Sequence, residues 1–348
     1  MINLLKEVAR GKRGARDLTY EESLQAAESI LGLKSTPAQI GAFLIAERIK
    51  LESLEELEAF VAVLRKYAHR EPVQEGLDCA GPYDGRISTF IATFPAAFLL
   101  SAAGLPVTLH GGSTLPPKWG ITLQDIIYEA GIDVSRLPRT EALAAARQSG
   151  VLFADAEQWC PPLGDIRQIR EELGMRTIIN TAEKLVDYSC SPFIAFGIYH
   201  NTVFDRLSRL LIKLGYQKAL VIQGAEGSED LYIDRPTRVY TVENGNAGLD
   251  IIDPESMGLD TPVPEMQWTA KLQLFTAEAV LQGGGHMAFY NQTLLNSAVR
   301  LHLAGKAGSV EEGLYICKDL LDNGQAWRVY TTWRSALQRS GEIATNHA

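Results

Sequence analysis

The stretch LDCAGPYDGRISTFIATFPAAFLLSAAGLPVTLHG, residues 77–111, decides the class of fold. It predicts a short apolar strand, a turn containing glycine, a long apolar helix over 89–104 and a second strand over 105–111. Further short apolar segments at 150–155, 218–224 and 238–245 alternate with helical segments. This alternation predicts an α/β domain whose central mixed, mostly parallel sheet is covered by helices.

The first seventy residues lack this alternation. Amphipathic helices are predicted there, and the pairs Thr19 with Glu22 and Ser53 with Glu56 form capping boxes at two of their starts. We therefore expect a small all-helical domain at residues 1–72 and a large α/β domain at 73–348. The helix around 165–185 is expected to join the helical domain. The segment 244–268, rich in Gly, Pro and Asp, is expected to be a long loop.

Composition excludes several classes of protein. The 348 residues are 46% hydrophobic and 22% charged, which is ordinary for a soluble globular protein. A net charge of −9 argues against a dedicated nucleic-acid binder, although a local basic stripe is compatible with it. The four cysteines have no zinc spacing and no secretory segment precedes them, so we expect a reduced, cytoplasmic protein. The apolar runs are too short to span a bilayer.

The turn AGPYDGR, residues 80–86, follows the first predicted strand. Gly81 and Gly85 would let an anion approach the backbone, and Arg86 would add positive charge. However, the proline of the turn has no N–H to donate, its tyrosine adds bulk, and Asp84 adds negative charge. The residues alone leave a phosphate-binding turn and a plain turn both open.

The loop LHGGSTLPPKWG, residues 109–120, follows the second predicted strand and precedes a helix. It is rich in hydrogen-bond donors and suits a phosphate or carboxylate, although its two prolines also fit a simple connection. We favour the anion site because His110 and Lys118 add polar groups at a crossover point. The candidate residues are His110, Gly111, Gly112, Ser113, Thr114 and Lys118.

Two charged segments follow. Arg167 and Arg170 would share a helix face and could hold a carboxylate or phosphate, although pairing with the neighbouring glutamates is the more usual outcome. Glu226, Glu229 and Asp230 follow a predicted strand and could hold Mg²⁺ on a phosphorylated ligand. A solvated acidic loop is the favoured interpretation of this second segment.

Five segments are spread along nearly the whole chain. In chain order they are TPAQIGAFLIAERIKLESLEELEAF (36–60), HGGSTLPPKWGITLQDIIYEAGI (110–132), IRQIREELGMRTIIN (166–180), LLIKLGYQKALVIQGAEG (210–227) and NSAVRLHLAGKAGSVEEGLYICKDLLDNGQA (296–326). Together they resemble the anthranilate phosphoribosyltransferase family, which shares its fold with the pyrimidine nucleoside phosphorylases. The resemblance implies a homodimer formed through the helical domain, Mg²⁺ as the metal and no organic cofactor.

The sequence departs from this family at the donor site. In active members, the first strand is followed by a Gly-Thr-Gly-Gly-Asp loop that binds the pyrophosphate of phosphoribosyl pyrophosphate. The corresponding residues here, Gly81 to Asp84, form a loop that is one residue shorter and lacks two glycines and the threonine. The family's Lys-His-Gly-Asn loop keeps only its middle residues, His110 and Gly111.

The acceptor and metal positions are partly kept. Arg170 matches the family's arginine that faces the carboxylate of anthranilate, whereas Cys160 replaces a nearby histidine. The acidic pair that carries Mg²⁺ in the family is matched by Glu226, with Glu229 and Asp230 displaced along the loop. These departures are typical of a divergent second branch of the family, of which some members are associated with nucleic-acid binding.

Three functions follow from the resemblance. The first is a phosphoribosyltransferase-like protein, a pentosyltransferase if active, whose altered donor site binds a phosphorylated small molecule or nucleotide. Its candidate ligand residues are Gly81, Asp84, Gly85, Arg86, His110, Gly111, Gly112, Ser113, Thr114, Lys118 and Arg170. The second is a catalytically silent homologue that binds nucleic acid or a nucleotide, with Lys12, Arg13 and Arg16 as the basic cluster. The third, with least support, is an anthranilate phosphoribosyltransferase of tryptophan biosynthesis. None involves a membrane.

Overall fold

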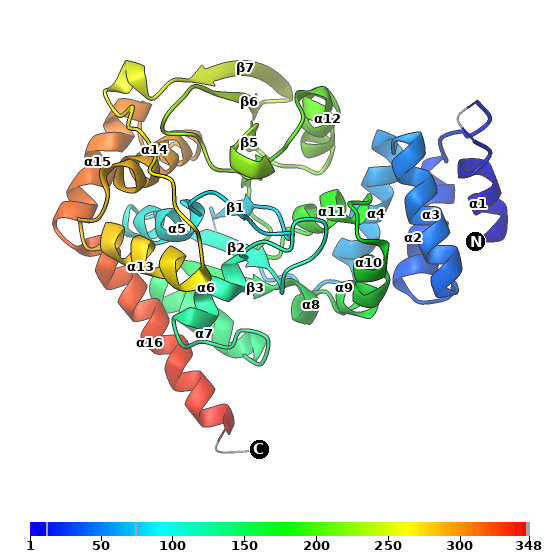
Figure 1. Cartoon of the computed structure of the whole chain (residues 1–348), viewed down its shortest axis with the longest axis horizontal. Helices are drawn as coiled ribbons and strands as arrows, with labels where there is room; N and C mark the ends of the chain where they lie inside the picture. Colours follow the sequence, from blue (N-terminus) through cyan, green and yellow to red (C-terminus); the bar gives the residue numbers. More distant parts are fainter. Residues whose placement is uncertain (12, 74, 346–348) are drawn as a thin grey trace.

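The computed structural model describes residues 1–11, 13–73 and 75–345, which form a small helical domain beside a larger α/β domain (Figure 1). The helical domain contains α1 (Ile2–Val8), α2 (Tyr20–Leu31), α3 (Pro37–Lys50) and α4 (Leu54–Tyr67). The two predicted capping boxes are present at the starts of α2 and α4, where they satisfy backbone N–H groups that have no partner inside the helix.

The α/β domain is built on one seven-stranded sheet in the order β3-β2-β1-β4-β5-β6-β7. The strands are β1 (Leu77–Ala80), β2 (Val107–Gly111), β3 (Val151–Asp155), β4 (Phe193–Gly197), β5 (Lys218–Ile222), β6 (Thr237–Glu243) and β7 (Asn246–Ile252). The first five in sequence run parallel, and β6 and β7 are antiparallel to their neighbours. The predicted mixed, mostly parallel sheet is therefore confirmed.

The order of the strands creates a crevice. From β1 the chain proceeds outward to β2 and β3, then returns to the other side of β1 to form β4 and β5. The connections that follow β1 and β4 therefore diverge at the carboxyl ends of these adjacent strands. In open α/β sheets, ligands bind at such a topological switch point.

Helices cover the sheet and contribute most of the core. The larger ones are α5 (Thr93–Ala102), α6 (Leu123–Glu129), α7 (Arg139–Ser149), α12 (Phe204–Lys213), α13 (Ala270–Leu281), α14 (Met287–Leu303), α15 (Val310–Asp322) and α16 (Gln325–Thr345). The apolar helix predicted over 89–104 is α5, whose side chains are almost all buried. Its Phe98 packs edge-on against Tyr330 and Trp333 of α16.

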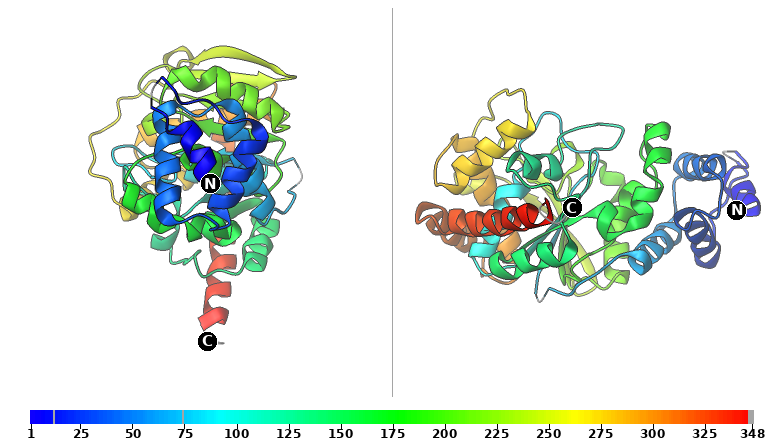
Figure 2. Two further views of the ribbon diagram at one scale, coloured as in Figure 1. Left: turned by 90° about the vertical axis from the view of Figure 1, so that its right-hand side faces the viewer. Right: turned by 90° about the horizontal axis from the view of Figure 1, so that it is seen from below.

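Short helices connect the two domains. They are α8 (Ala156–Trp159), α9 (Pro161–Asp165), α10 (Arg167–Leu173) and α11 (Ile179–Ala182). In sequence these helices lie between β3 and β4 of the α/β domain. In space, however, α10 contacts α3 and α11 contacts α4 of the helical domain. Figure 2 shows this group between the sheet and the helical domain. Among the described residues, no helix is long and apolar enough to cross a membrane.

The prediction of a loop over 244–268 is wrong in its first part. Asn244 and Gly245 both have positive φ, 52° and 75°, and connect β6 to β7 as a two-residue hairpin turn. An Asn-Gly pair favours this turn because both residues tolerate the left-handed conformation. The sequence pattern missed β7 because Asn246–Ile252 lies at the sheet edge and its side chains are mostly exposed.

Candidate functional site

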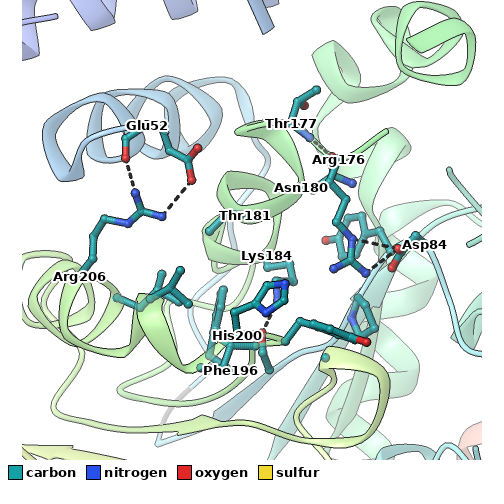
Figure 3. A pocket seen from close by; sticks show the side chains of 18 of the residues that line it. Glu52, Asp84, Arg176, Thr177, Asn180, Thr181, Lys184, Phe196, His200 and Arg206 are labelled. Atoms are coloured by element: carbon teal, nitrogen blue, oxygen red, sulfur yellow. Dashed lines mark hydrogen bonds and ion pairs between the residues drawn. The ribbon is translucent and has the colours of Figure 1, made fainter. Parts of the chain in front are cut away.

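A cavity of about 200 Å³ lies where the loops after β1 and β4 face the helical domain (Figure 3). It is lined by Arg48 of α3, by Tyr83 and Asp84 after β1, by residues of α11 and by Tyr199 after β4. Figure 3 shows the pair Arg206 and Glu52 on one side of the cavity and the pair Arg176 and Asp84 on the other. The cavity therefore occupies the switch point that the strand order creates.

Tyr83 decides the shape of the loop after β1. Its side chain is only 5% exposed, and its hydroxyl lies 2.6 Å from Nδ1 of His110. Nε2 of His110 lies 3.0 Å from Oδ1 of Asp78 in β1. Burial raises the pKa of Tyr83 well above its usual value, so the phenol stays protonated. The space left beside Tyr83, His110 and Gly112 is only about 30 Å³, which suits about one water molecule.

Asp84 is bound by two cations. Its Oδ2 accepts hydrogen bonds from Nε and Nη2 of Arg176 at 3.1 and 2.7 Å, and its Oδ1 lies 3.3 Å from Nζ of Lys118. Burial lowers the pKa of Lys118, against the opposing attraction of Asp84. The predicted anion-binding lysine thus already has a carboxylate partner, which comes from the adjacent predicted loop.

Arg86 is likewise occupied. It is 2% exposed, forms an ion pair with Asp230 and donates to the carbonyl of Phe90 at 2.8 Å. Asp230 also accepts from Thr93 Oγ1 at 2.6 Å and lies 3.1 Å from Arg300. Although burial opposes ionisation, the two arginines hold the pKa of Asp230 below its usual value. Both groups therefore belong to a buried ion cluster beneath the site.

The carboxylates of the acidic loop after β5 are not grouped together. Glu226 turns toward the loop that follows Arg86, whereas Glu229 is buried with its Oε2 unpartnered among the described residues. Across the part of the chain that the structure describes, no three acidic, histidine or cysteine residues are grouped to hold a metal ion. Asp230 already forms ion pairs with Arg86 and Arg300. The Mg²⁺ site at Glu226, Glu229 and Asp230 remains a prediction.

The arginines of the charged helix are paired with glutamates. Both terminal nitrogens of Arg170 bind Glu183, at 2.8 Å to Oε1 and 2.7 Å to Oε2. Burial raises the pKa of Glu183 even though Arg170 opposes the shift. Arg167 pairs with Glu157 at 2.5 Å and Glu171 at 2.8 Å. A ligand carboxylate would have to displace Glu183 to reach Arg170.

Backbone carbonyl groups of the loop after β2 accept hydrogen bonds from Arg167. Arg167 donates to the carbonyl oxygens of Ser113 and Thr114, at 3.3 and 2.7 Å. Gly111 and Gly112 border the small space beside Tyr83, together with Gly81 and Gly85. The structure thus brings the predicted glycines of the two loops together, while Ser113 and Thr114 use their carbonyls to anchor α10.

Sequence reasoning missed two polar groups that line the cavity, Lys184 and Thr177. Nζ of Lys184 donates to the carbonyl of Gly197 at 2.6 Å and lies 3.9 Å from the ring centre of Phe196. Burial lowers the pKa of this amine to about 7. Thr177 is 7% exposed, and its Oγ1 has no hydrogen-bond partner among the described residues. A lysine within the short helical segment TAEKLV was the signal that could have identified the site.

One residue of the basic N-terminal cluster, Arg16, is neutralised by glutamates. Arg16 donates to Glu22 at 2.7 Å and to Glu7 at 3.0 Å. Arg13 is exposed, and Lys12 lies outside the described residues. Arg16 is therefore part of an ion-pair network that fixes the start of α2.

Comparison with known proteins gives the family. Residues 2–68 match the helical bundle domain of the glycosyl transferase family, and residues 80–327 match its α/β domain. The chain is 30% identical over 311 residues to an uncharacterized protein of Aquifex aeolicus, covering 89% of this chain and 95% of that one. It is 27% identical over 331 residues to an anthranilate phosphoribosyltransferase of Persephonella marina, covering 94% and 97%.

Solved structures agree at the level of the fold. The anthranilate phosphoribosyltransferase of Thermus thermophilus superposes with a TM-score of 0.82 at 22% identity, covering 96% of this chain and 99% of that one. The enzyme of Saccharomyces cerevisiae in complex with phosphoribosyl pyrophosphate and Mg gives 0.82 at 18% identity, covering 97% and 98%.

A helical bundle joined to an α/β domain is the two-domain architecture of the glycosyl transferase family. This chain belongs to the glycosyl transferase family that includes the anthranilate phosphoribosyltransferases.

Proposed function

We propose that this protein is a phosphoribosyltransferase-like member of the family whose donor site is altered, and that it binds a phosphorylated small molecule or nucleotide without efficient ribosyl transfer. The observation that carries the proposal is the position of Tyr83. Its ring fills the turn after β1, and its hydroxyl is bound to His110. A pyrophosphate group needs free backbone N–H groups and space at this turn.

The acceptor side supports the same conclusion. Arg170, which the family resemblance places opposite the carboxylate of anthranilate, is bound at both terminal nitrogens by Glu183. Breaking a buried ion pair leaves an uncompensated charge, which costs about 3–5 kcal/mol. An aromatic acid of ordinary affinity does not offset that cost. We therefore propose that anthranilate is not the acceptor.

The cavity supplies the ligand site in this proposal. Arg48 provides positive charge, Lys184 adds charge when it is protonated, and the free Oγ1 of Thr177 provides a hydrogen-bonding group. Among the contacts that the structure describes, the side chain of Arg48 donates to a backbone carbonyl, that of Arg176 at 2.6 Å, rather than to a carboxylate. Cations without carboxylate partners attract a phosphate group more strongly than paired ones.

Mg²⁺ fits the acidic loop after β5 only in part. The unpartnered Oε2 of Glu229 is a suitable ligand for a cation, whereas Asp230 is held by Arg86 and Arg300. One free carboxylate is too few for an all-protein Mg²⁺ site, and Mg²⁺ usually binds through phosphate groups and water. We propose that Mg²⁺ enters with the phosphates of the ligand and neutralises their charge there.

Calorimetric titration tests this function. Wild-type protein is titrated at low salt with ribose 5-phosphate, a nucleoside monophosphate and phosphoribosyl pyrophosphate with Mg²⁺. We expect at least one to bind, and Arg48→Ala to weaken that binding about tenfold because a phosphate contact is lost. Arg147→Ala, on the exposed side of α7, serves as the matched control. Absence of heat with all three ligands would contradict the proposal.

Binding of nucleic acid is the alternative function. The pairing of Arg16 with two glutamates weakens it, whereas the exposed Arg13 favours it. A mobility-shift titration against salt tests for nucleic-acid binding, because affinity that depends on phosphate contacts falls steeply as the salt concentration rises. A shift at low salt that Arg13→Ala abolishes would establish the alternative.

We also propose a homodimer formed through the helical domain. Ile2, Ile49 and Leu51 of this domain expose 57%, 72% and 72% of their surface. Apolar side chains gathered on one domain favour association with a second copy. Sedimentation should show a dimer that Leu51→Glu dissociates, and a monomeric wild type would contradict this assembly.

A further inference from the structure

The amine of Lys184 lies at the wall of the interdomain cavity. Lys184 comes just after α11, is 7% exposed, and is one of the residues that line the cavity (Figure 3). Its Nζ donates to the carbonyl oxygen of Gly197 at 2.6 Å and lies 3.9 Å from the ring centre of Phe196. Both partners are the last residues of β4. The amine is therefore fixed at the switch point, where ligands of open α/β sheets bind.

The surroundings of this nitrogen favour the neutral amine. Burial, the largest influence, lowers the pKa of Lys184 to about 7, and the charge of Arg176 lowers it further. Three carboxylates oppose this shift: Glu229, Asp84 and Glu183. At pH 7 about half of the molecules therefore carry a neutral amine at this position, compared with about one in 2,500 for an ordinary lysine. A neutral lysine amine in a buried site is a nucleophile toward carbonyl carbons.

We propose that Lys184 forms a reversible imine with a phosphorylated aldehyde, and that this covalent bond retains the ligand in the cavity. The inference rests on the proposed function, since it names the class of phosphorylated compound that the cavity binds. Ligand sites in proteins usually measure about 300–1,000 Å³. A cavity of about 200 Å³ therefore favours a short aldehyde phosphate over a nucleotide.

Imine formation needs no co-reactant. The lone pair of Nζ forms a bond to the carbonyl carbon of the aldehyde, and the carbonyl oxygen takes up a proton to give a carbinolamine. The oxygen then leaves as water, and a C=N bond remains. Addition of water reverses the step and releases the aldehyde. The protonated imine is a cation, which the ring of Phe196 stabilises as it stabilises the ammonium group of Lys184.

The phosphate end of such a ligand has partners in the same cavity. The guanidinium of Arg48 is bound to the carbonyl oxygen of Arg176 at 2.6 Å, so its positive charge is not cancelled by that partner. Oγ1 of Thr177 has no hydrogen-bond partner among the described residues. A phosphate held by these groups would keep the aldehyde beside Nζ, and holding two reactants together raises their effective concentration.

Lys118 is a second buried amine near the switch point, and its environment differs. Burial lowers its pKa as well, but Asp84 opposes the shift and lies 3.3 Å from its Nζ. An ammonium group held by a carboxylate has no lone pair with which to attack a carbonyl carbon. The two nearest contacts of the Lys184 amine are instead a backbone carbonyl and an aromatic ring. The geometry therefore assigns the imine to Lys184.

Reductive trapping tests the imine. The wild type is incubated at pH 7 with glyceraldehyde 3-phosphate and sodium cyanoborohydride, which reduces an imine to a stable secondary amine. Mass spectrometry of peptides then locates the modified lysines. We expect Lys184 to be modified at least tenfold faster than Lys271, an exposed lysine of α13, because a far larger fraction of it is neutral. Equal or slower modification of Lys184 would overturn the proposal.

Variants and pH assign the reaction to this amine. Lys184→Met should remove the fast modification, and the matched control Lys271→Arg should leave it unchanged. The preference for Lys184 should be largest at or below pH 7 and should disappear by about pH 10, where an ordinary lysine is also neutral. If Lys184→Met does not fold, the comparison of Lys184 with Lys271 inside the wild type still decides, because it needs no variant.

Glycerol 3-phosphate separates this inference from the proposed function, because it carries a phosphate and no carbonyl group. It should bind in calorimetry and slow the modification of Lys184. Binding of glycerol 3-phosphate without preferential modification of Lys184 would overturn the imine and leave the proposed function standing. Absence of both would overturn the imine and count against the cavity as a phosphate site. Modification by glyceraldehyde at the same rate as by its phosphate would overturn the role of the phosphate.

Discussion

Most charged side chains around the interdomain cavity have an internal partner of opposite charge, and a few do not. Asp84 binds Arg176, Glu183 binds Arg170 and Asp230 binds Arg86. Removing one partner of a buried ion pair leaves an uncompensated charge, so charged groups that form internal pairs are less available to ligands of opposite charge. Lys184 and Arg48 differ because neither has a carboxylate within 4 Å among the residues that the structure describes.

The hydrogen bond between Tyr83 and His110 should stabilise the fold measurably. Tyr83→Phe keeps the ring in place and leaves Nδ1 of His110 without a partner. We expect the free energy of unfolding to fall by about 1–2 kcal/mol, as for other buried groups that lose their partner. Urea denaturation measures the change. Tyr315→Phe is the control because Tyr315 is 78% exposed, and equal stability of the two variants would contradict the buried hydrogen bond.

The buried amine of Lys184 should make stability depend on pH. Burial lowers its pKa in the folded protein to about 7 from 10.5. Between these values the unfolded chain binds more protons, so the free energy of unfolding rises with pH from about 7 to 10.5. Lys184→Met should remove this part of the slope. Denaturation at several pH values measures it, and parallel profiles would show that Lys184 titrates normally.

At the site, sequence patterns identified residues but could not identify their partners. His110, Asp84 and Lys118 were predicted among the residues that bind the phosphorylated ligand, and they do lie near the switch point. Asp84 and Arg176 are 92 residues apart in the chain, so their pairing depends on how the domains pack. Spacing along a helix says nothing about such contacts. The internal neutralisation of the site was therefore beyond the reach of the sequence.

Among the elements, those with strong local signals were predicted best. The capping boxes and the apolar helix α5 depend on neighbours within a few residues, and they were found. Strand β4, Phe193–Gly197, escaped notice because five apolar or small residues do not distinguish a strand from a buried helix segment. Strand β7 was not predicted because an exposed edge strand has no apolar face in its sequence.

The end of β4 lies too close to the acidic loop to accept a side chain. A Cβ on Gly197 would lie 2.1 Å from the carbonyl carbon of Ser228, whereas one on Gly248 of β7 would meet open space. Gly197→Ala should therefore cost about 3 kcal/mol, at the upper end for an overpacked core. Gly248→Ala should change stability by less than about 0.5 kcal/mol. Thermal denaturation compares the two, and equal melting temperatures would contradict the close approach of these loops.

For the whole molecule, the family architecture has been kept, and we propose that the groups in its crevice have changed. The fold superposes on anthranilate phosphoribosyltransferases over nearly the full chain, and the cavity lies between the same two domains that the family matches. Fold alone does not carry an activity, since function depends on the particular side chains at a site. The proposed loss of ribosyl transfer therefore depends on the internal pairing of charged groups in the crevice.

The most direct measurement is the consumption of anthranilate, followed by its fluorescence, with phosphoribosyl pyrophosphate and Mg²⁺ at saturating concentrations. The account predicts no loss of fluorescence beyond that of a sample without protein, because Tyr83 fills the donor turn and Glu183 holds Arg170. Steady turnover that Arg170→Ala abolishes would show that ligands displace these internal partners, and would contradict the account.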